Sequence, residues 1–70
     1  MGQISLEAAR VNANLTQAEL AKKLGVSRNT VIAWERGKAP IKSAYLYAFC
    51  HIVGMNEENI RLPEVEKEEK

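Results

Sequence analysis

The sequence contains a single cysteine, Cys50, and no long apolar run. One cysteine excludes an internal disulfide framework and cannot build a metal site alone, which is typical of a reducing compartment. No apolar stretch approaches the roughly 20 residues of a membrane span, and the first residues lack the basic-then-apolar order of a secretory signal. We therefore expect a cytoplasmic protein that does not associate with a membrane.

Groupings of catalytic residues are also missing. The chain has one histidine, and we find no acid and base pair, activated nucleophile or glycine-rich phosphate loop. Cys50 and His51 are neighbours, but adjacent helical residues point about 100° apart and no third partner is evident. We interpret them as a core cysteine beside a solvent-facing histidine. The sequence predicts no enzyme, cofactor, metal ion or small-molecule substrate.

The chain has too few residues for two cores. It has 70 residues, of which 46% are hydrophobic and 27% charged, so one small domain is expected. Residues 1–54 carry seven Lys or Arg and three Glu, whereas residues 55–70 carry three Lys or Arg and six Glu. Such asymmetry suits a body that faces a polyanion, although ordinary solvated surface explains the charges alone equally well. We place the domain at 1–63 and a charged, disordered tail at 64–70.

Helical patterns account for nearly all of the domain, and no strand pattern is evident. Thr16 and Glu19 form a capping box, Ser27 is a good N-cap, and Gly25 and Gly37 can end the helices that follow these caps. We expect an all-α fold, a compact five-helix bundle. The expected helices span about 4–14, 16–24, 27–36, 41 or 43–53, and 56–62.

The second and third expected helices form a helix-turn-helix arrangement. Ala21 is small enough for a close crossing, Gly25 makes the turn, and Val31 fills the angle between the helices. In DNA-binding proteins this arrangement presents the second of its helices to the major groove, but purely structural helical corners look similar. The outer face separates the two interpretations, because Arg28 and Asn29 place hydrogen-bonding groups where a reading helix needs them.

The stretch LTQAELAKKLGVSRNTVIAWERGKAP resembles the helix-turn-helix core of the bacterial and phage Cro/C1-type repressors, the Xre family. The matching motifs are L-T-Q before the second helix, A-x-x-x-G, and S-x-x-T-[VI]-x-x-W-E-x-G. The similarity extends from about Ile4 to Leu62. It implies a lambda-repressor-like fold of five helices and a sequence-specific domain for double-stranded DNA, usually a transcriptional repressor that acts as a dimer.

The resemblance also implies roles for individual residues. A family ion pair between the first and third helices would correspond to Arg10 and Glu35. Asn14 stands where the family commonly has glycine, and Ala33 where some relatives have a polar base reader, which leaves Ala33 only packing contacts. The implied base contacts are Ser27, Arg28, Asn29, Ile32 and Ala33, and the backbone contacts are Gln17, Thr30, Arg36, Lys38, Lys42 and Ser43.

A rival interpretation is an antitoxin-like or anti-repressor protein, which uses the same fold chiefly to bind another protein. The two interpretations differ in one respect: only the DNA-binding interpretation requires that basic residues on the third helix and its flanks control binding to DNA. For assembly, we expect a weak homodimer that is favoured on DNA. Its apolar surface is expected near the C-terminus, at Met55, Ile60, Leu62 and Val65.

Overall fold

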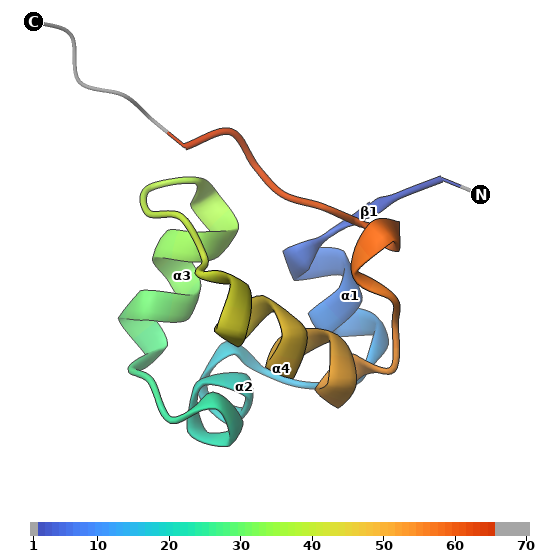
Figure 1. Ribbon diagram of the computed structural model, residues 1–70. Helices are drawn as coiled ribbons and strands as arrows, with labels where there is room; N and C mark the ends of the chain where they lie inside the picture. Colours follow the sequence, from blue (N-terminus) through green and yellow to red (C-terminus); the bar gives the residue numbers. More distant parts are fainter. Residues whose placement is uncertain (1, 66–70) are drawn as a thin grey trace, which may run out of the picture.

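The protein, described here by a computed structural model over residues 2–65, is mostly helical, with four α-helices and one 3-10 turn in these residues (Figure 1). Two very short strands accompany the helices. None of the helices in this part of the chain is long and apolar enough to cross a membrane. The elements in chain order are β1 (Ile4–Ser5), α1 (Leu6–Asn12), α2 (Gln17–Leu24), α3 (Arg28–Arg36), α4 (Ser43–Val53), η1 (Glu57–Asn59) and β2 (Ile60–Arg61).

The helices begin where capping side chains are available. Thr16 accepts a hydrogen bond from the backbone N–H of Glu19, whose carboxylate accepts from the N–H of Thr16, so the predicted capping box is confirmed. Ser27 caps α3 in the predicted way, by accepting from a backbone N–H of its first turn. Ser5 caps α1, whereas Lys42 precedes α4 without a side-chain cap. Local hydrogen bonds therefore set three of the four starts.

The core lies where the four helices meet. Trp34 is buried, with its ring centroid 5.3 Å from that of Tyr45, and Cys50 is buried beside an exposed His51 as predicted. Leu46 and Val53 of α4 pack against this core and are only partly buried. The buried apolar residues are Leu6, Ala9, Leu20, Ala21, Val31, Trp34, Phe49, Cys50 and Ile60.

The predicted fifth helix over 56–62 is wrong. Only η1 is helical there, and Ile60–Arg61 form β2, which pairs in parallel with β1 so that Ile4 lies opposite Ile60. The expectation of no strands fails for the same reason. Ile4 belongs to β1, so the first helix starts two residues later than its apolar pattern suggested. Tertiary pairing between the two ends of the domain overrides the weak local helix signal after Asn56.

The segment after β2 runs along the end of α3. A hollow of about 70 Å³ lies between this segment and the α3–α4 connection. Gly37 ends α3 at φ 75°. It lies so close to the segment after β2 that a Cβ added at Gly37 would be 2.5 Å from the carbonyl oxygen of Glu64. The hollow is lined by Trp34, Ala39, Pro40, Ile41, Leu62, Pro63 and Val65. Residues 66–70, the larger part of the expected disordered tail, lie outside the described residues, so the tail and the boundary at residue 63 stay predictions.

Candidate nucleic-acid interface

The turn between α2 and α3 is closed by backbone hydrogen bonds. Gly25 adopts φ 75°, its N–H donates to the carbonyl of Lys22 over 3.3 Å, and the N–H of Val26 donates to that of Ala21 over 3.0 Å. This is the Schellman pattern, which needs a residue that tolerates the left-handed region. The side chains of Ala21 and Val31 are buried. The two helices are therefore held at a fixed angle by a tight turn and a close apolar contact.

The first turn of α3 presents polar side chains to solvent. Arg28 and Asn29 are exposed, and neither side chain has a hydrogen-bond or ion-pair partner among residues 2–65. Ser27 is exposed too, but its hydroxyl caps the helix and lies 3.0 Å from that of Thr30. Ile32 and Ala33, further along the helix, are half-buried. Within residues 2–65, the first turn of α3 thus carries two exposed hydrogen-bonding side chains that no other residue engages.

The other expected contact residues lie at two further positions. Arg36, Lys38, Lys42 and Ser43 are exposed at the end of α3, in the connection and at the start of α4. Lys38 has an interaction partner, whereas Arg36 carries no ion pair within the described residues. Gln17, at the start of α2, is half-buried and hydrogen-bonded inside the protein. The four exposed residues therefore lie on α3, on its connection to α4 and at the start of α4, where a ligand can contact them.

An internal network joins α1, α2 and α3. The Arg10 Nε atom donates to Glu35 Oε2 over 2.6 Å, and the side chains of Arg10 and Glu35 are only 9% and 4% exposed. A second nitrogen of Arg10 donates to the carbonyl oxygen of Leu15 over 2.8 Å. Gln17 Nε2 donates to Glu35 Oε1 over 3.1 Å. The resemblance implied the Arg10–Glu35 pair, but sequence reasoning missed the bond from Gln17, because it depends on how α2 and α3 cross.

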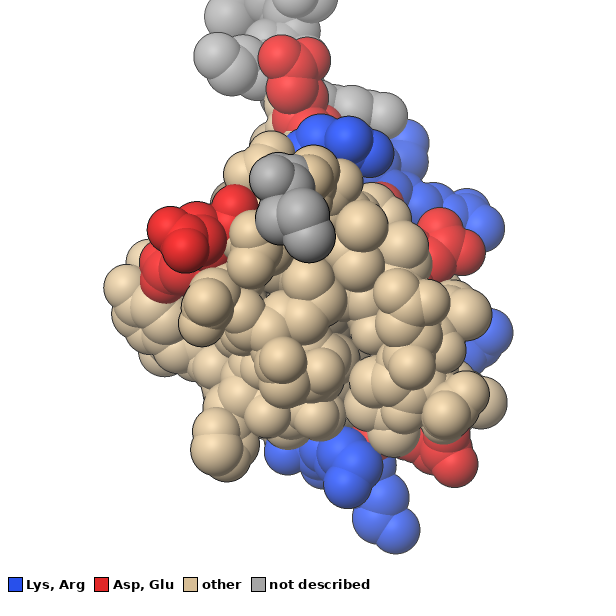
Figure 2. Space-filling view, turned by 90° about the vertical axis from the view of Figure 1, so that its right-hand side faces the viewer, with Lys and Arg blue, Asp and Glu red and all other residues tan. Residues whose placement is uncertain are grey.

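Away from α3, the molecule has a largely uncharged face with acidic and basic side chains around its edge (Figure 2). The view is taken from the side of α1, opposite the side on which α3 lies in Figure 1. Lysine and arginine side chains gather at the rim of this face and are missing from its centre. A surface without positive charge does not attract phosphates, so this face is a poor candidate for nucleic acid.

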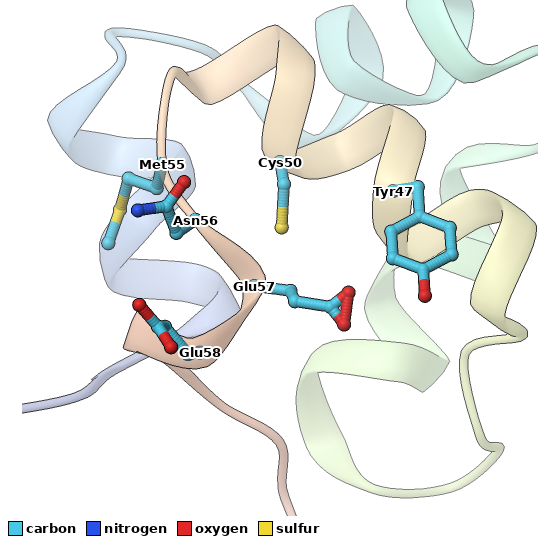
Figure 3. A pocket seen from close by; sticks show the side chains of 6 residues that line it. All are labelled: Tyr47, Cys50, Met55, Asn56, Glu57 and Glu58. Atoms are coloured by element: carbon cyan, nitrogen blue, oxygen red, sulfur yellow. The ribbon is translucent and has the colours of Figure 1, made fainter.

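An open hollow between α4 and η1 is also unsuited to DNA (Figure 3). Glu57 and Glu58 line it and would repel phosphate groups. The Cys50 thiol points into it, and burial, with a smaller contribution from the Glu57 carboxylate, raises the pKa of this thiol. A raised pKa disfavours the thiolate and hence nucleophilic chemistry. No cluster of three or more metal-ligating side chains occurs between residues 2 and 65.

Comparison with known proteins agrees with this geometry. A family model described as helix-turn-helix matches residues 6–58. An uncharacterized HTH-type transcriptional regulator of Methanocaldococcus jannaschii, MJ0272, is 47% identical over 47 residues, which cover 67% of this chain and 71% of that protein. No solved structure matches the chain.

Proposed function

Because the chain belongs to the Cro/C1-type (Xre) helix-turn-helix family, whose domains have a lambda-repressor-like fold, we propose that it regulates transcription by binding double-stranded DNA sequence-specifically. In this proposal α3 occupies the major groove, and regulation is repression inside the cell, without enzymatic chemistry. The observation that supports it best is the exposure of Arg28 and Asn29 in the first turn of α3, where neither side chain has a partner among the described residues.

Base reading falls to the start of α3. Arginine can donate two hydrogen bonds to guanine O6 and N7, and asparagine can bond adenine N6 and N7, so Arg28 and Asn29 each contribute about 1–3 kcal/mol of discrimination. Ser27 shares a hydrogen bond with Thr30; when Ser27 donates in it, Ser27 can still accept a hydrogen bond from a base and Thr30 keeps its proton for a phosphate. Ile32 and Ala33 make apolar contacts further along the groove, such as packing on a thymine methyl group.

Phosphate contacts flank the reading helix. Gln17 offers its second amide hydrogen, and Thr30 its hydroxyl, on one side of the groove. Arg36 and Lys42 bring positive charge on the other side. Lys38 and Ser43 complete the proposed backbone contacts. These contacts hold the protein in register and make its affinity dependent on salt.

The proposal is tested by selecting binding sites from random duplexes and titrating variants on the selected site and a scrambled duplex. Arg28→Ala and Asn29→Ala should each reduce the ratio of specific to non-specific affinity about tenfold or more. Arg36→Ala and Lys42→Ala should instead weaken binding to both duplexes and lower the salt slope by about one unit each. Lys23→Ala removes a similar charge from α2, outside the proposed contacts, and is the matched control.

An unchanged ratio in both α3 variants would reject base reading by this helix. The antitoxin-like or anti-repressor interpretation would then be preferred, because it uses the fold without requiring contact between α3 and bases. Selection that returns no consensus sequence would point the same way.

A further inference from the structure

We infer that Glu35 is a positioning residue for DNA binding: it holds the side-chain amide of Gln17, at the start of α2, in the orientation that receives a DNA phosphate. This inference rests on the proposed function and adds a residue that acts without touching DNA. The side chain of Glu35 is 4% exposed, so it cannot reach a phosphate, and its negative charge would repel one. Any effect of Glu35 on DNA must therefore pass through another group.

Gln17 is the side chain through which that effect passes. Its Nε2 atom donates to Glu35 Oε1 over 3.1 Å. The assignment of the amide nitrogen follows from chemistry, because an ionised carboxylate accepts hydrogen bonds and cannot donate them. A primary amide carries two hydrogens, and the bond to Glu35 occupies one, which leaves the other for a phosphate oxygen. The bond thus decides which way Gln17 presents its free donor.

The backbone around Gln17 is fixed by the same network. Arg10 donates to the carbonyl oxygen of Leu15 over 2.8 Å, and Gln17 is bonded to Glu35, so the residues on both sides of Thr16 are anchored. Thr16 is the N-cap of α2, and helix geometry leaves the N–H groups of Gln17 and Ala18 without an intrahelical acceptor. In the proposed complex, these N–H groups and the Gln17 amide donate together to one DNA phosphate.

Burial of the ion pair makes the anchor rigid. Glu35 Oε2 accepts from Arg10 Nε, and Glu35 Oε1 accepts from Gln17 Nε2 and, over 3.4 Å, from Arg10 Nη2, which is not the nitrogen that donates to Leu15. A buried carboxylate with these donors loses them only at a large energetic cost. Gln17 therefore enters the DNA complex already ordered, and binding does not have to order it.

A matched set of variants isolates this role. Arg10→Met combined with Glu35→Leu removes the charges and the acceptor, whereas Arg10→Met combined with Glu35→Gln removes the charges but keeps an oxygen that can accept from Gln17. Both avoid an unpaired buried charge. We call these double variants the Met/Leu pair and the Met/Gln pair. Gln17→Ala is introduced into the wild type and into each double variant. Gln3→Ala is the control, because the amide of Gln3 donates to the carbonyl of Glu58 over 3.0 Å, at the other end of the domain.

Dissociation constants for the selected duplex are measured on variants whose circular dichroism shows them folded. In the wild type, Gln17→Ala should weaken binding about tenfold, and the Met/Leu pair should lose nearly as much. Adding Gln17→Ala to the Met/Leu pair should then cost less than about twofold. The Met/Gln pair should bind within about threefold of the wild type, and Gln3→Ala should bind as the wild type does.

Equal losses from Gln17→Ala in the wild type and the Met/Leu pair would overturn the inference and leave the proposed function intact. Absence of specific binding by the wild type would overturn both. The order of the Gln17 side-chain amide in the free wild-type protein, measured by NMR relaxation, tests the inference even if the Met/Leu pair does not fold. A rigid amide, with an order parameter near 0.8, is expected, and a value below about 0.6 would overturn the inference.

Discussion

Folding removes the charged side chains of Arg10 and Glu35 almost completely from water. Loss of one partner leaves the other charge buried and uncompensated, so Arg10→Met or Glu35→Leu alone should lower the free energy of unfolding by on the order of 3 kcal/mol. Replacing both should cost less than the sum of the single changes. Urea unfolding of the four proteins in this double-mutant cycle measures the coupling, and a coupling near zero would show that the pair adds nothing to stability.

Cys50 should make stability sensitive to alkaline pH. Burial, and to a smaller extent the Glu57 carboxylate, raises the pKa of its thiol in the folded protein. The folded protein therefore holds the thiol proton more tightly than the unfolded chain does. The stability that this difference contributes is complete below the ordinary thiol pKa and is lost as the pH rises from there through the raised pKa. The difference in free energy of unfolding between wild type and Cys50→Ala should shrink over that range. Urea unfolding at a series of pH values measures it, and parallel pH profiles would contradict the expected change.

At the scale of elements, Gly37 differs from the two other glycines that end helices. Gly25, Gly37 and Gly54 all adopt φ 75°, but an added Cβ meets nothing within 4 Å at Gly25 or Gly54, whereas at Gly37 it would lie 2.5 Å from a backbone oxygen of Glu64. Gly25→Ala and Gly54→Ala should each cost about 1 kcal/mol for the left-handed backbone, and Gly37→Ala should cost more.

Urea unfolding of the three alanine variants, with and without residues 64–70, separates the two causes. Removal of these residues takes away the carbonyl of Glu64, so the extra cost at Gly37 should disappear. An equal cost at all three glycines in the full chain would show that the segment moves aside freely.

The elements also show which features a sequence can reveal. Some features depend on residues that are only a few positions apart, and the local sequence predicts them directly. They are the capping box at Thr16, the cap at Ser27 and the glycines that end helices. The pairing of Ile4 with Ile60 depends on residues 56 positions apart, and two-residue strands are too short to show alternation. The predicted fifth helix was wrong because the pairing of β1 with β2 cannot be recognised from the residues around 56–62 alone.

The candidate site divides in the same way. Exposure of Arg28 and Asn29 follows from the helical period and from the inward positions of Val31 and Trp34. The bond between Gln17 and Glu35 joins residues from different helices and requires a particular crossing of α2 and α3. The family resemblance implied a phosphate contact for Gln17, but nothing in the sequence indicated that its amide bonds the Glu35 carboxylate.

At the scale of the whole molecule, the expected dimer surface needs correction. Ile60 was expected to offer apolar surface to a second copy, but it is 5% exposed and packs in the core. Leu62 is 43% exposed, while Val65 and Met55 are partly buried and line two different hollows. Of the four residues proposed for pairing, Leu62 therefore offers the most accessible side chain.

We still propose a weak homodimer that forms on DNA, with half-sites about one helical turn apart. The protein alone should sediment as a monomer at micromolar concentration, and two copies should bind one duplex that carries both half-sites. Leu62→Glu should reduce this cooperative binding and leave binding to a single half-site unchanged. One protein per duplex at saturation would contradict the dimer.

The parallel pair of β1 and β2 has a consequence for the order in which the chain acquires its structure. Ile4 meets Ile60 only after the intervening residues have been synthesised, whereas α2 and α3 are neighbours in the chain and can pack as soon as both have left the ribosome. The entropy lost in closing so long a loop is recovered only when its interior is already ordered. We therefore expect the two ends of the domain to join last, after α2 and α3 have packed against each other.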